Sequence, residues 1–169
     1  MRKLFSIAVA IITVVSGAQA KSKTASILPA NFDVPDVLVG IVSDVYVQSE
    51  TFRAQCDRLG RATNMQVSLR LDARIRPSCR AFTVITRKNG TLCAEVHLPP
   101  SVQMAELLGH EFEHIIEQLE HVNLRLLARV RGSGVREIDF ELFETERAQR
   151  TGIIVATEVR LRQDRPSAN

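Results

Sequence analysis

The stretch LLGHEFEHIIEQLEH, from Leu107 to His121, constrains the fold more than any other part of the chain. Apolar residues within this stretch and beside it recur at helical spacing and gather within roughly an 80° arc of the helix surface. The residues of this arc are Met104, Leu108, Phe112, Ile115, Leu119 and Val122. His110 and His114 are four residues apart, so they project together from another face of the same helix. The segment must therefore bury one face and keep an imidazole pair on a second face.

The flanking residues favour a long helix. Ser101 follows Pro99 and Pro100 as a suitable N-cap, and no further proline occurs until Pro166. Gly109 lies inside this helix, where glycine costs about 1 kcal/mol relative to alanine. We therefore expect another backbone to approach closely at Gly109.

Two neutral imidazoles at this spacing supply two corners of a tetrahedral zinc site, and Glu111 is placed to activate a zinc-bound water. The alternatives are a chance pattern or two histidines that bind no metal. A catalytic zinc usually takes three protein ligands, so a third is needed. Glu117 and His121 face the same way as His110, but helical rise places them about 10 and 16 Å along the axis. We expect both to bond to the ligands, line the cleft or be solvated.

The sequence His110-Glu111-Phe112-Glu113-His114 resembles the HExxH motif of the zincin metallopeptidases. It is most similar to the gluzincin type, in which a following helix supplies a glutamate ligand, here within FETERAQRTG. The metzincin type fits badly, because Glu117 and Glu120 stand where that type has glycine and histidine. The resemblance implies hydrolysis of peptide bonds, with one Zn²⁺ per chain and Glu111 as the catalytic base.

The third ligand is expected to be Glu144 and not Glu146. Residues that are two positions apart on a helix point about 200° away from each other, so only one of these two glutamates can face a shared site. On a helix through this segment, Glu144 shares its face with Ala148, Thr151, Val155 and Val159. The alternative is that Glu144 pairs with an arginine such as Arg147. The predicted metal ligands are therefore His110, His114 and Glu144.

The group that stabilises the oxyanion is not identified by the motif. Tyr46, His97, His121 and Arg147 are chemically able to do so, although each also has a structural interpretation.

Residues 1–20 have the pattern of a secretory signal peptide: Arg2 and Lys3, an apolar run from Leu4 to Val15, and Ala18-Gln19-Ala20. The run is shorter than the roughly 20 residues of a spanning helix, so we expect no stable membrane span after cleavage. We predict export to the periplasm or the exterior. A flexible lead-in over residues 21–35 and a single zincin-like metallopeptidase domain over residues 36–165 are expected to follow.

The charge pattern gives no reason to expect nucleic acid as a partner. The formal charge of +3 falls to about +1 without Arg2 and Lys3, and basic residues are interspersed with acidic ones. No glycine-rich phosphate loop is present, and aromatic residues are few. Cys56, Cys79 and Cys93 permit at most one disulfide, which export favours and which would leave one thiol. The sequence does not choose the pair.

The rest of the chain predicts an α+β fold, with an N-terminal helix and antiparallel strands followed by two long C-terminal helices that carry the metal site. A helix is expected over Thr51 to Arg61. The β-branched residues of Val37 to Val47 favour a strand, although the helix could begin earlier. Met65 to Arg76 alternates as a half-buried strand does. Asn89-Gly90 predicts a hairpin, and RGSG at 131–134 separates the last two helices, the second ending near Arg162.

Three functions remain open at this point. The first is a small exported peptidase acting on a peptide or protein substrate, and the second is a non-catalytic binding protein with structural zinc on a zincin-like scaffold. The third is a metal-free interaction domain. The oligomeric state is not indicated by the sequence.

Overall fold

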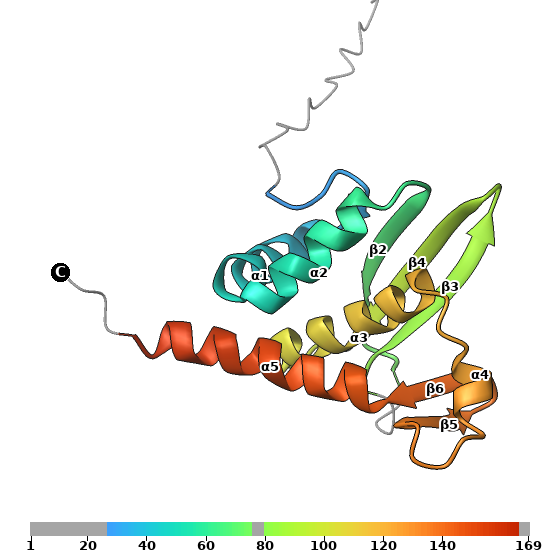
Figure 1. Cartoon of the computed structure of the whole chain (residues 1–169). Coiled ribbons are helices and arrows are strands. Elements are labelled where there is room, and N and C mark those ends of the chain that lie inside the picture. The colour runs from blue at the N-terminus through green and yellow to red at the C-terminus, as the bar shows by residue number, and fades with distance from the viewer. Residues whose placement is uncertain (1–26, 76–79, 166–169) are drawn as a thin grey trace, which may run out of the picture.

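Residues 27–75 and 80–165 are described by the computed structural model, in which the periodic patterns of the sequence form an α+β fold (Figure 1). The elements in chain order are β1 (Phe32–Asp33), α1 (Asp36–Gln48), α2 (Glu50–Arg61), β2 (Met65–Leu71), β3 (Phe82–Lys88), β4 (Thr91–Leu98), α3 (Met104–Leu119), α4 (Leu124–Leu127), β5 (Val135–Asp139), β6 (Leu142–Thr145) and α5 (Glu146–Gln163). One sheet has the order β1-β2-β4-β3, and β5 and β6 form a separate hairpin. The predicted α+β class is confirmed.

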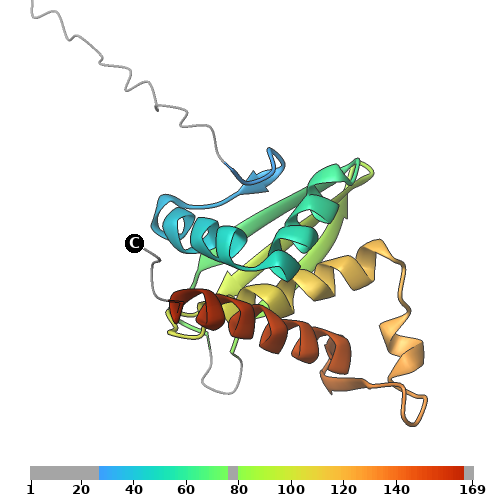
Figure 2. The same cartoon turned by 60° about the vertical axis from the view of Figure 1, so that its left-hand side comes forward.

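One face of the larger sheet carries the core. Alternate residues of β2 and β4 are buried on this face: Met65, Val67, Leu69, Ala94, Val96 and Leu98. Helices α1, α2 and α3 cover this face (Figure 2). The half-buried strand expected from Met65 is confirmed, and it ends at Leu71.

Strands β3 and β4 form the hairpin predicted at Asn89-Gly90. Both turn residues have positive φ, 50° for Asn89 and 82° for Gly90. The expectation of purely antiparallel strands is wrong: β4 lies between β3 and β2 and runs parallel to β2, and β1 is also parallel to β2. Alternation predicts which side chains face the core, but it is the same for either strand direction.

Residues 36–48 form helix α1, so the strand favoured over Val37 to Val47 is wrong. The buried residues Leu38, Val42 and Val45 follow helical spacing. Burial of this stripe outweighs strand propensity, which spans only about 1 kcal/mol. The helix expected over Thr51 to Arg61 is confirmed as α2, and the Ser49 hydroxyl caps it by accepting a hydrogen bond from the Phe52 amide at 3.0 Å.

The segment predicted as a flexible lead-in belongs to the fold from residue 28 onward. Leu28 is buried, and the side-chain amide of Asn31 donates to the carbonyl oxygens of Leu59 and Met65 at 3.1 Å each. These contacts join β1 to the end of α2 and the start of β2. The signal predicted over residues 1–20 lies outside the described residues. No helix within the described ranges is long and apolar enough to cross a membrane.

Cys56 and Cys93 are free thiols, the first buried in the core and the second half-buried on β4. Any pair among the three cysteines includes at least one of these two, so the expected disulfide is contradicted. Cys79 lies outside the described residues. Burial raises the pKa of Cys56, so its thiol stays protonated and acts as a small apolar side chain.

Glu158 joins α5 to the junction between α1 and α2. Its carboxylate accepts hydrogen bonds from the Ser49 hydroxyl at 2.5 Å and from the Thr51 amide and hydroxyl at 3.0 and 2.8 Å. Burial raises the pKa of Glu158, but the hydrogen bonds outweigh burial and hold the pKa below its usual value. Glu158 therefore stabilises the fold above the unfolded carboxyl pKa, about 4.3, and this contribution is lost as the pH falls through the lower folded pKa.

Helix α5 packs closely on α3 because glycines lie between them (Figure 1). A Cβ atom on Gly152 would lie 2.7 Å from the carbonyl oxygen of Glu106 and 3.1 Å from the Cβ of His110. A Cβ atom on Gly109 would lie 2.6 Å from Cγ2 of Val155. These distances are too short for ordinary contact, so the close approach expected at Gly109 is confirmed.

We predict that Gly152→Ala lowers the free energy of unfolding by about 1 to 3 kcal/mol, because its methyl group overlaps the Glu106 carbonyl. Gly40→Ala is the matched control, since Gly40 lies inside α1 with nothing within 4 Å of an added Cβ. It should raise the free energy of unfolding by up to about 1 kcal/mol. Urea unfolding followed by circular dichroism measures both, and a neutral Gly152→Ala would contradict the close packing.

Candidate metal centre

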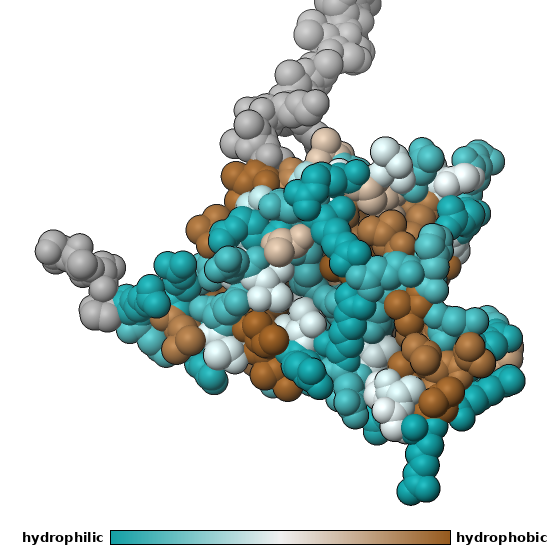
Figure 3. Space-filling model, viewed as in Figure 1, coloured by the Kyte–Doolittle hydropathy of each residue, from teal (hydrophilic) through white to brown (hydrophobic). Residues whose placement is uncertain are grey.

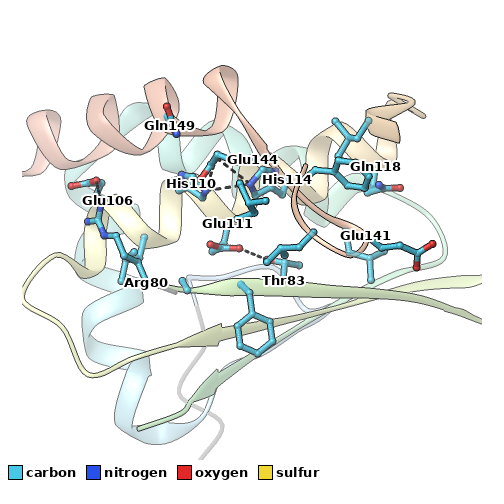
Figure 4. A pocket seen from close by; sticks show the side chains of 18 of the residues that line it. Arg80, Thr83, Glu106, His110, Glu111, His114, Gln118, Glu141, Glu144 and Gln149 are labelled. Carbon is cyan, nitrogen blue, oxygen red and sulfur yellow. Dashed lines mark hydrogen bonds and ion pairs between the residues drawn. The ribbon is translucent and has the colours of Figure 1, made fainter. Parts of the chain in front are cut away.

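Helix α3 presents His110 and His114 side by side in a cleft (Figure 4). Their Nε2 atoms are 3.2 Å apart. Glu144 Oε1 lies 3.3 Å from Nε2 of His110 and 3.9 Å from Nε2 of His114. One ligand atom from each of the three residues lies within 4.8 Å of the other two. The structure therefore brings together the three residues predicted as metal ligands.

Glu144 reaches the histidines from strand β6, and not from a helix as predicted. The second long helix begins only at Glu146, because residues 135–145 form the β5–β6 hairpin. Thr145 is the N-cap of α5, and its hydroxyl accepts a hydrogen bond from the Ala148 amide at 2.9 Å. The argument from a small, apolar helical face is therefore wrong. Glu144 instead reaches the cleft from β6, whose residues Leu142 and Phe143 also line it.

The other charged residues near Glu144 have different partners. Glu146 is exposed at the first position of α5 and lies beside Gly134. Arg147, the alternative partner considered for Glu144, donates from Nε to Glu113 Oε1 at 2.6 Å and from Nη1 to Glu120. Among the described residues Glu144 forms no ion pair with an arginine, and its Oε1 accepts a hydrogen bond from the Thr145 amide at 2.9 Å beside the two histidines.

Glu117 is a buried link between the candidate ligand His114 and Thr145, the residue that follows Glu144. Its Oε2 lies 3.0 Å from Nδ1 of His114, and its Oε1 accepts a hydrogen bond from the Thr145 hydroxyl at 2.8 Å. Because a carboxylate faces Nδ1, we assign the proton of neutral His114 to that nitrogen, which leaves a lone pair on Nε2, 3.2 Å from Nε2 of His110. Glu117 was expected to bond to a ligand, and it does.

The pKa values of the two histidines move in opposite directions. Burial lowers the pKa of His110 more than the nearby Glu144 carboxylate raises it. Burial also lowers the pKa of His114, but the hydrogen bond to Glu117 and the charges of Glu111 and Glu144 outweigh burial and raise it. A metal bound at His114 therefore has to displace a proton whenever Nε2 is protonated.

The chemistry of the donor set suits a divalent cation. Two imidazole nitrogens and a carboxylate oxygen converge, and a proton placed on Nε2 of His110 would satisfy only one of the two acceptors that face that nitrogen. A cation placed among the three groups would satisfy all of them. Imidazole and carboxylate ligands are those of catalytic zinc sites.

Glu111 points into the same cleft from below the histidines (Figure 4). Its side chain is buried, and Oε2 accepts a hydrogen bond from the Thr83 hydroxyl of β3 at 2.7 Å. Burial raises the pKa of Glu111 to about 7, against the lowering effects of His114 and Thr83. A carboxylate in this state can both accept and return a proton near neutral pH.

The cleft has a volume of about 580 Å³ and runs between β3, α3 and the β5–β6 hairpin. Arg80 and Glu106 lie at one end, and Gln118 and Glu141 at the other (Figure 4). None of the four residues considered for the oxyanion lines it. The Tyr46 hydroxyl donates to Asp57, His97 lies on the uncovered face of the sheet, His121 is exposed after α3, and Arg147 binds two glutamates.

Sequence reasoning missed Thr83 and the residues of the hairpin. Thr83 has no local signal, because it meets Glu111 only through the packing of β3 on α3. The hairpin did have a signal: Thr145 followed by the acidic Glu146 is a helix start, which would have ended the strand at Thr145.

Comparison of this chain with known protein families, curated proteins and solved structures finds no match.

Glu144→Ala is predicted to weaken zinc binding at least about 10-fold, because a coordinating oxygen is lost. Glu146→Ala, two residues away and exposed, should keep the parental affinity. Competition with a fluorescent zinc chelator measures both dissociation constants. The opposite ranking of the two variants would remove Glu144 from the candidate centre.

A second pair of variants separates orientation of a ligand from stability. Glu117→Gln should weaken zinc binding about 10-fold or more, since a neutral amide oxygen accepts the hydrogen bond from Nδ1 of His114 more weakly than a carboxylate does. Glu113→Gln replaces another buried glutamate of α3, which faces Gln55 and Arg147 and no candidate ligand. It should lower the melting temperature and leave zinc affinity unchanged. Unchanged zinc affinity in Glu117→Gln would show that His114 does not need this partner.

Proposed function

We propose that this protein is a zinc-dependent hydrolase of peptide bonds. The observation that carries the proposal is the convergence of His110, His114 and Glu144 within 4.8 Å beside the buried carboxylate of Glu111. The resemblance of residues 110–114 to the zincin motif supports it further. Export to the periplasm or the exterior is part of the proposal and stays a prediction.

The ligand set defines what each residue does. His110, His114 and Glu144 would hold the metal, and Glu117 orients His114. Zinc, when bound, would polarise the substrate carbonyl and lower the pKa of a water molecule. The cleft, lined by β3, α3 and the β5–β6 hairpin, would hold a peptide beside these residues.

Glu111 is the proposed base. The Thr83 hydroxyl occupies its Oε2, so Oε1 is the atom that takes a proton from the attacking water. The same oxygen then returns the proton to the leaving amine. Thr83 holds the carboxylate in one orientation, because the hydroxyl comes from a strand of the sheet and not from a loop.

A binding protein with structural zinc is the second candidate. One observation favours it: the candidate ligands come from α3 and from β6, so an ion among them would cross-link two elements that are distant in sequence. Metal removal would then lower the melting temperature, and no peptide would be hydrolysed.

Glu111→Gln is predicted to bind about one zinc per chain, as the parent does, and to lose at least about 100-fold in peptide hydrolysis. Mass spectrometry of metal in protein purified without a histidine tag gives the stoichiometry, and cleavage of fluorescent casein gives the rate. Glu95→Gln, on the uncovered face of the sheet, is the control and should keep both. Full activity in Glu111→Gln would exclude Glu111 as the base, and a metal-free parent would exclude both proposed functions.

A further inference from the structure

The β5–β6 hairpin is irregular where it meets the cleft. Its pairing register shifts between Glu137 and Asp139, so Ile138 stands at a β-bulge. A bulge redirects a side chain from the regular alternation of a strand. Ile138 lines the cleft and is 59% exposed. The fold therefore holds an isoleucine open to solvent beside the candidate centre.

Ile138 belongs to an apolar wall at this end of the cleft. The residues of the apolar wall are Ile85, Leu124, Ile138, Leu142 and Phe143. They come from β3, from α4 and from both strands of the hairpin. Figure 3 shows apolar side chains gathered at the surface over α4, β5 and β6. The wall adjoins Glu144, because Leu142 and Phe143 directly precede it on β6 and all three line the cleft.

The charged groups at the ends of the cleft already have partners within the chain. Arg80 donates from Nη1 to Glu106 Oε1 at 2.9 Å, and Glu141 pairs with Arg125. A charged substrate group would have to displace one of these ion pairs. An apolar group placed against the wall would remove apolar surface from water with no such loss.

We propose that the cleft selects peptides that carry a large apolar side chain, such as leucine or phenylalanine, next to the cleaved bond. The side chain would pack against the apolar wall, with Ile138 as the main determinant of specificity. This inference names the substrate class of the proposed peptidase and rests on that function. The wall can nevertheless be tested by binding alone.

Binding is measured with short peptides of glycine and serine, acetylated and amidated at their ends, that contain either one leucine or serine at the same position. A single apolar residue selects its own register, so the cleaved bond need not be known. Titration calorimetry of zinc-loaded Glu111→Gln protein should show at least about 10-fold tighter binding of the leucine peptide.

Two variants of the same hairpin test the wall. Ile138→Ser, made in the Glu111→Gln protein, should reduce the preference for leucine to below about 3-fold. Phe140→Ser is the matched control, because Phe140 is 86% exposed at the hairpin turn and does not line the cleft. It should keep the full preference. Circular dichroism and zinc stoichiometry establish that both variants fold.

Equal binding of the two peptides, or an undiminished preference in Ile138→Ser, would overturn the inference. Cleavage of the same peptides by the parent protein is followed by mass spectrometry in parallel. Cleavage with no preference for leucine overturns the apolar wall and keeps the proposed function. Preferential binding with no cleavage of any peptide keeps the wall and overturns the peptidase.

Discussion

The close packing of α5 on α3 is the contact on which the candidate centre depends. Gly152 lies against the Glu106 carbonyl and the Cβ of His110, so the two helices are closer together than any residue with a Cβ at position 152 would allow. The second turn of α5 therefore lies against His110, and the residue just before the N-cap of α5 is Glu144. The hydrogen bonds of Glu158 hold the far half of the same helix. Ligand geometry is thus set by helix packing and not by the ligands themselves.

Helix α3 also buries three glutamates, and each has its own partners. Glu113 binds Gln55 and Arg147 and joins three helices, Glu117 joins His114 to Thr145, and Glu111 receives a hydroxyl from the sheet. Burying a carboxylate costs free energy unless it is paired or hydrogen-bonded, so the fold requires these contacts. Glu113 therefore stabilises the packing of the helices, Glu117 orients a histidine, and Glu111 has a carboxylate oxygen available for chemistry.

Sequence patterns predicted the features that depend on neighbouring residues and missed those that depend on contacts between distant elements. The imidazole pair, helix α2 and the Asn89-Gly90 hairpin follow from spacing or turn chemistry within a few residues. The parallel pairing of β2 with β4 does not, because strand alternation carries no direction. Glu144 was selected from a helical face that does not exist, and it lies beside the histidines because β6 runs along the cleft just before α5 begins. Thr83 could be found only after β3 was placed against α3.

The segment between α3 and α5 is fastened at both ends by one side chain. The Glu117 carboxylate, near the end of α3, bonds to His114 and to Thr145 at the start of α5. The segment between the two helices therefore begins and ends beside the same carboxylate. A loop whose ends are held together loses little when its middle changes length, because closure entropy grows slowly with loop size. The turn at Phe140 can therefore be lengthened or shortened while Glu144 stays in place. In a lineage of such proteins, selectivity could diversify through insertions at this turn while the ligand set remained constant.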